Sequence, residues 1–439
     1  MLEESQFKLI DELIRAALTA VDPENVVKNA LDLKNSILKI QNQPFDLSEF
    51  EHIYLIAFGK ASLKMAKATD DLIGRFITGG IIVSKKKNSE IRLPDKYTCL
   101  VGGHPIPDQN SLESAQRILN LVKDAGNRDL IICLISGGGS ALLTLPENGI
   151  SLKDIADLTK LLLENGANIQ EINAIRKHID RIKGGKLAIA AAPARIVTLI
   201  LSDVIGNSLE AVASGPTVPD STTYRDCLEI IQKYHLSEKI PAAIYERILI
   251  GAGGDIPETL KDDSPILKNI SNYLIGDNST AVNAVVEKGK SLGLNVSVIP
   301  KPIIGEAREA GRFLAAELRK PVTFKPSLLV GGGETTVTIK GKGLGGRNLE
   351  TALAAVKDLA GIPNIALVTL ATDGEDGPTD AAGAIVTGET FLEGLKKGLD
   401  PDLFLDNNDS YHYFEQTGGL IKTGSTGTNV NDLVFLFHF

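Results

Sequence analysis

Apolar residues in the first half of this chain form short continuous runs that alternate with segments of helical periodicity. The runs cover residues 53–58, 80–84, 98–101, 130–135 and 196–202. A continuous apolar run of this length is typical of a strand that is buried on both faces. The pattern therefore predicts a mostly parallel, Rossmann-like α/β sheet that helices cover on both faces.

The second half of the chain has a related but different pattern. Predicted strands at residues 273–276, 296–299 and 328–330 alternate with predicted helices, whereas residues 334–339 alternate polar with apolar side chains. Such alternation is typical of a half-exposed antiparallel strand. We therefore predict an α/β fold with two α/β/α lobes, a mixed sheet in the C-terminal lobe and an active site in the cleft between the lobes.

The predicted elements divide the chain into three segments. Its 439 residues exceed one ordinary hydrophobic core. Residues 1–45 are predicted to be an N-terminal helical lead-in, with a second helix running from Pro23 to about residue 40. Residues 46–250 form the predicted Rossmann-like domain, and residues 265–439 form the C-terminal α/β domain. An irregular stretch over residues 236–264 marks the junction.

Composition and charge narrow the class of protein. A hydrophobic share of 43% and a charged share of 23% are typical of a globular chain rather than a disordered one. The net charge is -9 and the longest basic run is Lys85-Lys86-Lys87, so we expect no nucleic-acid partner. No apolar stretch reaches the length of about 18 residues that a membrane span needs. We therefore expect a small-molecule partner and no membrane association, and the sequence leaves a homodimer open.

The cysteines and the N-terminus indicate the compartment. Cys99, Cys133 and Cys227 lie far apart in the sequence, which argues against a disulfide framework and against a zinc site. The N-terminal segment is acidic and lacks the positive and apolar regions of a signal peptide. We therefore expect a cytoplasmic protein.

Glycine-rich segments follow two of the predicted buried strands, at the strand ends where open α/β sheets bind ligands. Gly59-Lys60 places a lysine at a helix N-terminus, which suits either a phosphate contact or an ordinary surface position. Ser136-Gly137-Gly138-Gly139-Ser140 offers hydroxyl groups and backbone N–H groups that can approach a polyphosphate. Neither segment is a Walker A loop, because G-x-x-x-x-G-K-[ST] does not occur in the chain. We expect nucleotide phosphates at the second segment.

Charged residues gather again in residues 173–186. Arg176 and His178 fit a solvated helix face. Lys183 and Lys186 flank paired glycines ahead of an apolar helix, so they are candidates for binding the anionic part of a cofactor.

Two acidic residues at predicted strand ends are further candidates. Asp203 follows a buried strand, where an aspartate can cap a helix or bind a metal. Gly331-Gly332-Gly333-Glu334 ends another predicted strand in a glycine-rich style, which makes Glu334 a candidate cofactor-binding residue.

The C-terminal part holds a second pair of chemically suggestive segments. Gly345-Gly346-Arg347-Asn348 starts a predicted helix, and an acidic segment that includes Asp373 follows the apolar run 365–370. Helix-starting glycines with an arginine suit an anion, and clustered acids suit a metal or a sugar hydroxyl. Phosphoryl transfer needs both kinds of site, one for the anion and one for the metal or the hydroxyl group. The same region contains a literal G-x-G-x-x-G over residues 341–346, but the strand before it lacks the buried pattern of a dinucleotide fold.

Seven segments, in their order and spacing along nearly the whole chain, resemble the class II glycerate 2-kinase family. They are Gly59-Lys60-Ala61-Ser62, Gly102-Gly103-His104-Pro105, Ser136-Gly137-Gly138-Gly139-Ser140-Ala141, Leu201-Ser202-Asp203-Val204, Ala213-Ser214-Gly215-Pro216-Thr217, Gly332-Gly333-Glu334-Thr335-Thr336-Val337 and Thr372-Asp373-Gly374-Glu375-Asp376-Gly377. The part from residue 328 onward resembles the leucine-rich domain of that family.

The resemblance implies ATP-dependent phosphorylation of D-glycerate on its 2-hydroxyl with a divalent cation, for which we expect Mg²⁺. It implies that Lys60 and Arg347 are catalytic cations and that Asp373 lies in the acidic loop of the site. We expect Asp373 to act as the base, and Asp203 or Asp373 to hold the metal. Some members of the family carry the name hydroxypyruvate reductase, so an NAD(P)-dependent reductase is the alternative.

Overall fold

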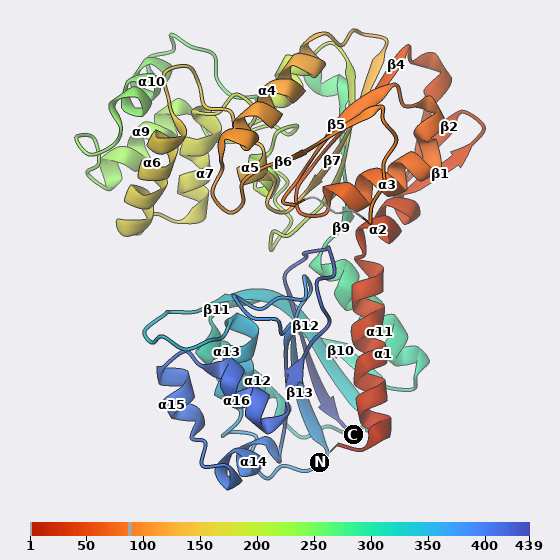
Figure 1. The fold of residues 1–439 in the computed structure, drawn as a ribbon, viewed down its shortest axis with the longest axis vertical. Helices are drawn as coiled ribbons and strands as arrows, with labels where there is room; N and C mark the ends of the chain where they lie inside the picture. The colour runs from red at the N-terminus through yellow and green to blue at the C-terminus, as the bar shows by residue number, and fades with distance from the viewer. Residues whose placement is uncertain (1, 87–89) are drawn as a thin grey trace. The chain divides into compact units, whose positions relative to one another are not determined.

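The computed structural model of the protein describes residues 2–86 and 90–439 (Figure 1). The chain forms two compact units. We call Pro23–Ile275 the Rossmann-like unit, and we call the residues up to Asp22 together with Gly276–Phe439 the mixed-sheet unit. Lys87, the last residue of the basic triplet, lies outside the described residues.

The main sheet of the Rossmann-like unit has the strand order β6-β5-β4-β7-β8-β9. Its strands are β4 His52–Phe58, β5 Gly79–Ser84, β6 Tyr97–Val101, β7 Asp129–Ser136, β8 Arg195–Leu201 and β9 Ile270–Gly276. The pairs β4–β5, β5–β6, β4–β7 and β7–β8 are parallel, which confirms the predicted parallel sheet. The chain steps outward from β4 to β6 and then returns to the other side of β4, so the topological switch point lies between β4 and β7. Ligands bind at the carboxyl ends of the strands at such a point.

Helices cover both faces of this sheet. They are α3 Ser62–Ile73, α4 Gln109–Lys123, α5 Gly139–Leu142 and α8 Lys186–Ala191. Ile56 and Phe58 of β4 pack in one core with residues of α4 and α8. Because side chains alternate along a strand, Leu55 and Ala57 face the other way, and α3 packs on that face (Figure 1). Burial on both faces explains why these strands are apolar throughout.

A group of four helices lies to one side of this sheet and has its own core (Figure 1). They are α6 Leu152–Glu164, α7 Ile169–His178, α9 Tyr224–Lys233 and α10 Ala242–Ala252. The stretch 236–264, predicted to be an irregular junction, therefore contains a helix, because Ile244 and Ile248 pack into this core. The boundary between the units falls instead at Ile275, after β9 has joined the first sheet.

The predicted helix from Pro23 to about residue 40 is shorter than expected. Helix α2 spans Pro23–Ala30, and an antiparallel sheet of β1 Leu31–Lys34, β2 Ile37–Ile40 and β3 Gln43–Asp46 follows it. Asn35 and Gln41 adopt positive φ angles of 58° and 52° in the two tight turns, which a helix cannot accommodate. Leu38, Ile40 and Phe45 are buried by this arrangement, so tertiary packing overrides the helical spacing.

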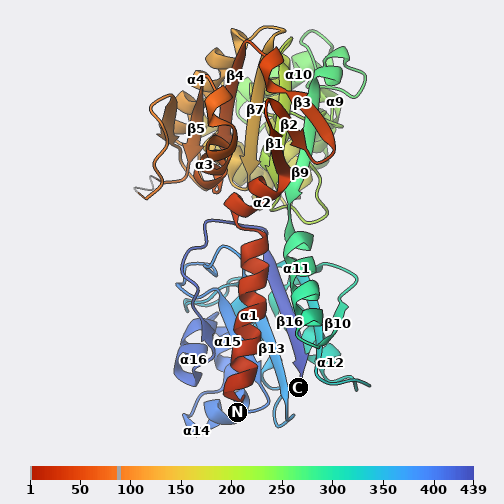
Figure 2. The same ribbon diagram turned by 90° about the vertical axis from the view of Figure 1, so that its right-hand side faces the viewer.

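The first helix, α1 Glu4–Ala20, belongs to the mixed-sheet unit. Its apolar face packs beside α11 Asn278–Ser291, and Lys288 of α11 lies 2.9 Å from Glu12 (Figure 2). The division into units thus separates α1 from the rest of the predicted 1–45 lead-in, because the partner of its apolar face lies near residue 280.

The sheet of the mixed-sheet unit has the order β10-β12-β16-β13-β14-β15, with β11 also paired to β12. Its strands are β10 Asn295–Val298, β11 Ile303–Glu306, β12 Ser327–Thr336, β13 Ile365–Ala371, β14 Gly383–Thr387, β15 Leu420–Ile421 and β16 Asp432–His438. Strands β10 and β11 pair with β12 in parallel, whereas β16 pairs with β12 and β13 antiparallel. The predicted mixed sheet is confirmed.

Strand β12 corrects one detail of the prediction. Two strands with a glycine loop between them were expected, but β12 runs unbroken through Gly331-Gly332-Gly333. A Cβ atom on Gly333 would lie 1.9 Å from the carbonyl oxygen of Ile303 in β11. The glycines therefore let a neighbouring backbone approach closely instead of forming a turn. Residues 333–336 of β12 pair with β11 in parallel, whereas the alternation over residues 334–339 predicted an antiparallel strand.

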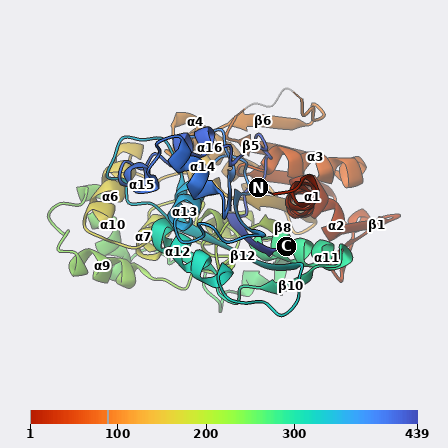
Figure 3. The same ribbon diagram turned by 90° about the horizontal axis from the view of Figure 1, so that it is seen from below.

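Helices flank this second sheet. Besides α1 and α11 they are α12 Ala307–Leu318, α13 Arg347–Ala355, α14 Thr390–Lys396, α15 Pro401–Asp406 and α16 Ser410–Thr417. Figure 3 shows α1 and α11 on one side of β10 and β12, and α12 and α13 on the other. Among the residues that the structure describes, no helix is long and apolar enough to cross a bilayer.

Candidate functional site

The two glycine-rich segments of the Rossmann-like unit meet at the topological switch point. The backbone N–H of Lys60 donates to the carbonyl oxygen of Gly137 (2.9 Å), and the N–H of Ala61 donates to Ser136 Oγ (3.0 Å). Gly59 has a φ of +124°, and a Cβ there would lie 2.2 Å from Ser136 Oγ, so no other residue fits. These contacts place the half-buried Lys60 beside the glycine turn.

Three side chains surround the glycine turn that follows β7. Gly138 has a φ of +79°, and a Cβ there would lie 2.9 Å from the ring of His104 and 3.3 Å from Lys60 Cγ. A Cβ on Gly137 would lie 2.0 Å from Asp203 Oδ2. Lys60 and Asp203 were both predicted site residues, and the structure brings both to this turn. His104 was missed as a site residue, although its Gly-Gly-His-Pro motif had been noted.

His104 is neutral at physiological pH. Its burial, together with the nearby cations Lys60 and Lys85, lowers its pKa to about 4. Within the described part of the chain, its Nδ1 is buried and has no hydrogen-bond partner. A neutral imidazole beside a glycine turn can therefore still accept or donate a hydrogen bond to a ligand.

Ser140, the last residue of the predicted phosphate segment, contacts a strained loop. Its hydroxyl shares a hydrogen bond of 3.0 Å with the hydroxyl of Ser214. Ala213 and Ser214 have φ angles of 50° and 60°, and left-handed backbone at such residues costs about 1–3 kcal/mol each. The N–H groups of Gly184 and Gly185 donate to the carbonyl oxygens of Ser214 (3.0 Å) and Gly215 (2.7 Å) and hold this conformation. The paired glycines therefore support the serine that holds Ser140.

The two lysines beside those glycines have partners inside the protein. Lys183 is buried, and its Nζ lies 2.7 Å from Asp180 Oδ2 and 3.1 Å from both Thr144 Oγ1 and the carbonyl oxygen of Leu143. Lys186 donates to the carbonyl oxygen of Asp180 (2.7 Å) and to Glu147 Oε1 (3.1 Å). Burial lowers the pKa of both lysines. Their ammonium groups hold the protein's own loops together, and a role in binding a cofactor stays a prediction.

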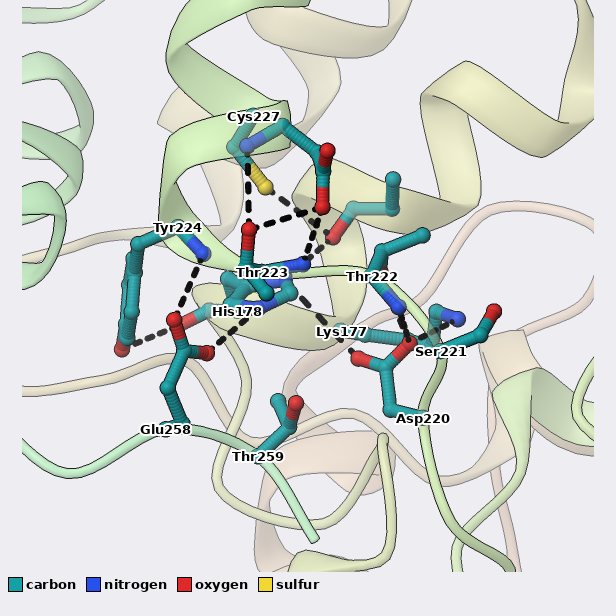
Figure 4. Close-up of polar contacts among 12 residues, drawn as sticks. Lys177, His178, Asp220, Ser221, Thr222, Thr223, Tyr224, Cys227, Glu258 and Thr259 are labelled. Atoms are coloured by element: carbon teal, nitrogen blue, oxygen red, sulfur yellow. Dashed lines mark hydrogen bonds and ion pairs between the residues drawn. The ribbon is translucent and has the colours of Figure 1, made fainter. Parts of the chain in front are cut away.

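The expectation of a solvated helix face at the end of α7 was wrong. His178 is fully buried, with Nδ1 2.8 Å from the carbonyl oxygen of Ala174 and Nε2 3.1 Å from Glu258 Oε2 (Figure 4). Lys177 is buried as well and pairs with Asp220. The charges face inward because α9 packs against this end of α7, as the edge contact between Tyr224 and His178 shows.

In the mixed-sheet unit, Arg347 begins α13 and is held by two carboxylates. Its Nε donates to Asp432 Oδ2 (2.6 Å), its NH2 group donates to Asp432 Oδ1 (3.1 Å), and its NH1 group donates to Glu334 Oε1 (2.6 Å). Asp432 is buried, and this burial raises its pKa to about 7 even though the guanidinium opposes the rise. The sequence did not single out Asp432, although it ends the polar loop before the last apolar strand.

The acidic loop that holds Asp373 is attached to the same helix end. Buried Asp376 accepts hydrogen bonds from the N–H groups of Asn348 (3.0 Å) and Leu349 (2.8 Å) and so caps α13. A Cβ on Gly346 would lie 2.4 Å from Asp376 Cγ, which requires glycine at that place. Asp373 is half-buried, and its Oδ1 accepts from the N–H of Glu375 (3.2 Å). The two predicted segments around Arg347 and Asp373 are thus brought together through Asp376, which belongs to the quoted acidic motif but was not a predicted site residue.

Comparison with known proteins identifies the family. Residues 9–249 match a family described as a domain of unknown function (DUF4147), and residues 327–432 match the MOFRL family. A D-glycerate 2-kinase from Thermotoga maritima is 41% identical over 98% of this chain and 98% of its own. A glycerate 2-kinase from Pyrococcus horikoshii is 42% identical over 99% of this chain and 96% of its own. The chain belongs to the glycerate 2-kinase family.

A solved structure and a further relative are also similar to this chain. The crystal structure of a glycerate kinase from Thermotoga maritima, 39% identical, matches with a TM-score of 0.87 over 100% of both chains. The family and the predicted α/β fold, with one mostly parallel and one mixed sheet, are therefore confirmed. A protein from Agrobacterium vitis, 38% identical over 86% of this chain and 97% of its own, is provisionally named a hydroxypyruvate reductase.

For this member of the glycerate 2-kinase family, the G-x-G-x-x-G segment does not have the geometry of a dinucleotide site. The N–H groups of Lys340 and Gly341 donate to Asn408 Oδ1, and those of the next three residues donate to Asn407 and Asp409. In a dinucleotide fold, the backbone of such a loop faces the pyrophosphate. Here five consecutive N–H groups are used by the protein's own loop.

The carboxylates predicted to hold a metal lie in different units. Asp203 belongs to the Rossmann-like unit and Asp373 to the mixed-sheet unit. Over residues 2–86 and 90–439, no group of three or more His, Cys, Asp or Glu side chains has the arrangement of a complete metal site. A cation here would therefore need further ligands that the protein does not supply. Mg²⁺ bound to a nucleotide obtains such ligands from the phosphates and from water.

Proposed function

We propose that this protein is an ATP-dependent kinase that transfers the γ-phosphoryl group of ATP to the 2-hydroxyl of D-glycerate. The relatives named as D-glycerate 2-kinase and glycerate 2-kinase match nearly the full length of the chain. The observation that carries the proposal is the turn Gly137-Gly138 at the switch point, which Lys60 and Asp203 flank. Such a turn suits the phosphates of a nucleotide, and the lysine suits the charge that develops during transfer.

The chemistry needs positioning and charge more than covalent help from the protein. The 2-hydroxyl oxygen bonds to the γ-phosphorus, the bond from that phosphorus to the bridging oxygen breaks, and ADP leaves. We assign Lys60 and Arg347 to the negative charge that spreads during this step, and Asp373 to the hydroxyl proton. Lys60 belongs to the Rossmann-like unit, and Arg347 and Asp373 belong to the mixed-sheet unit.

Supporting roles follow for the other predicted residues. The segment from Ser136 to Ser140 would hold phosphates through its N–H and hydroxyl groups, with Ser140 set by Ser214. Glu334, predicted to bind the cofactor, contacts Arg347, so we assign it the orientation of that guanidinium. Lys183 and Lys186 would act by keeping the 180–186 loop in place.

Mg²⁺ fits the residues present. Oxygen ligands are what this ion prefers, and Asp203 lies against the glycine turn where nucleotide phosphates would sit. Asp203 or Asp373 would supply a carboxylate ligand from the protein. When bound, the ion would neutralise phosphate charge and orient the oxygens of ATP.

We also propose that the protein works in the cytoplasm, with D-glycerate as its small-molecule partner and neither nucleic acid nor membrane as a partner. Cys99, Cys133 and Cys227 are free thiols, which fits a reducing compartment.

The proposed phosphoryl transfer is tested by detecting the phosphorylated product. Purified protein is incubated with D-glycerate, ATP and Mg²⁺ and examined by phosphorus NMR, while a parallel sample with hydroxypyruvate and NADH is followed by absorbance. A 2-phosphoglycerate signal with constant NADH supports the proposal. A 3-phosphoglycerate signal corrects the position of transfer, and NADH consumption without a phosphoester contradicts the kinase and supports the reductase.

A variant pair tests the lysine. Lys60→Met should lower turnover by roughly 100-fold or more, as loss of a transition-state charge contact does. Lys67→Met is the matched control, because Lys67 lies on the neighbouring helix α3 and forms an exposed pair with Asp71. Normal turnover in Lys60→Met would contradict the proposed catalytic role of Lys60.

A further inference from the structure

A cavity of about 500 Å³ lies in the Rossmann-like unit next to the glycine turn. Gly138 and Ser140 line it on one side. Helix α6, together with α7 and the residue after it, forms much of the remaining wall, with apolar side chains that include Leu152, Ile155 and Ile179. The cavity is therefore a mainly apolar space that is continuous with the proposed phosphate site.

One cation on the cavity wall lacks a compensating charge. Arg176 of α7 donates through NH2 to Thr159 Oγ1 (3.1 Å), and in the described part of the chain no carboxylate lies within ion-pair distance of it. Burial lowers the pKa of its guanidinium. Lys183 lines the same cavity, and the two cations repel each other. A partly buried guanidinium without a carboxylate is costly unless a ligand supplies negative charge.

The acidic residues of the cavity are already paired. Asp180 is held by Lys183 at 2.7 Å and by the N–H groups of Leu145 and Ile182. Glu164 lies 3.8 Å from Lys160. A bound anion would therefore neutralise the charge of Arg176 in this cavity.

We propose that this cavity takes the adenosine part of ATP, with the purine against the apolar wall and the phosphates leading past Arg176 to the glycine turn. The inference rests on the proposed kinase function. The volume of the cavity lies within the range of about 300–1,000 Å³ that is typical of sites for ligands as large as adenosine. D-glycerate, a three-carbon acid, would leave most of the space empty and would not use the apolar wall. The direction also brings the terminal phosphates toward Lys60, because a Cβ on Gly138 of the cavity wall would lie 3.3 Å from Lys60 Cγ.

The test separates the nucleoside from its phosphates. Ala156 lies on the exposed side of α6 and lines the cavity, so a tryptophan there fills the space without entering a packed core. Titration calorimetry measures the binding of ADP and of pyrophosphate to the unaltered protein and to Ala156→Trp. We expect ADP binding to weaken by roughly 10-fold or more and pyrophosphate binding to change by less than about twofold. Ala242→Trp is the control, because Ala242 is exposed on α10, in the same unit and outside the cavity wall.

Arg176 gives an independent measurement. Arg176→Ala should weaken both ADP and pyrophosphate by roughly 10-fold, because a charge-assisted contact is lost, and Arg176→Lys should restore part of the affinity. Unchanged ADP affinity in both Ala156→Trp and Arg176→Ala overturns the inference. The inference is also overturned if Ala156→Trp weakens the binding of pyrophosphate as much as it weakens the binding of ADP. If the unaltered protein forms no phosphoglycerate, the proposed function itself fails. Normal phosphoglycerate formation with unchanged ADP binding in the variants rejects only the adenosine site.

Discussion

Replacing Arg347 by alanine should destabilise the protein in a way that depends on pH. The guanidinium makes two hydrogen bonds to Asp432 and one to Glu334. Asp432 is 6% exposed, so its carboxylate has little access to water once the arginine is gone. Glu334 is 43% exposed at its side chain and can be solvated instead. The effect of the substitution therefore depends on the protonation of Asp432.

The sign follows from the raised pKa of Asp432. Between its ordinary value of 3.8 and about 7, the folded state binds this proton more tightly than the unfolded state does. The stability that this group contributes is therefore present at low pH and is lost as the pH rises through that window. Over roughly three pH units, at about 1.4 kcal/mol each, the loss is about 4 kcal/mol in the unaltered protein.

Removing Arg347 extends this loss to higher pH. At pH 5.5 Asp432 is protonated with or without the arginine, so the substitution costs about 1.5 kcal/mol, as for a hydrogen bond in which only the guanidinium is charged. At pH 8.5 the unaltered protein has an ion pair, whereas the variant has a buried carboxyl group without its cation. That cost is about 3 kcal/mol, the lower limit for breaking a buried pair, because Arg347 is itself partly exposed.

Urea denaturation at pH 5.5, 7.0 and 8.5 measures these values. The chain has no tryptophan, so far-UV circular dichroism should follow unfolding. Lys357→Ala is the control, because Lys357 pairs with Asp400 and Asp402 at the surface and should cost less than about 0.5 kcal/mol at each pH. An equal cost of Arg347→Ala at pH 5.5 and 8.5 would refute the reasoning. Turnover should also fall by roughly 100-fold, and Arg347→Lys should not restore it, since lysine lacks the two-pronged geometry.

Three further substitutions test the Rossmann-like unit. Ser136→Ala should lower the free energy of unfolding by about 1–3 kcal/mol, because the buried N–H of Ala61 loses its acceptor; unchanged stability in a denaturation experiment would contradict this. Lys183→Met should destabilise by about 3 kcal/mol, because Asp180 loses its buried cation, whereas a raised KM for ATP at normal stability would support the predicted cofactor contact instead. Gly137→Val should reduce turnover in an ADP-release assay by roughly 100-fold, because its Cβ would overlap Asp203; a rate within twofold of normal would argue against this packing.

The first sheet and its ligand-binding edge could be predicted from local sequence. Strand β7 is buried along its whole length, and burial on both faces imposes the continuous apolar run that the sequence displays. Parallel strands end at one edge, so Lys60 and the glycine turn after Ser136 could be expected to meet, and the backbone hydrogen bond from Lys60 to Gly137 joins them.

Other features depend on partners that lie far apart in the sequence. Arg347 and Asp432 are 85 residues apart and meet because β16 lies between β12 and β13, an order that no local pattern encodes. His178 looks like a surface residue from its charged neighbours, yet it is buried because α9 packs on α7. The unbroken course of β12 likewise depends on the backbone of Ile303 approaching Gly333.

The sequence by itself determined the buried strands, the glycine turns and the identity of the cations, because steric limits and periodic burial act on neighbouring residues. Only the tertiary structure decided which carboxylate holds Arg347, which lysines are used internally and where a cavity adjoins the glycine turn. Those outcomes depend on the order of strands and the packing of helices, whose free energies come from contacts between segments distant in the chain.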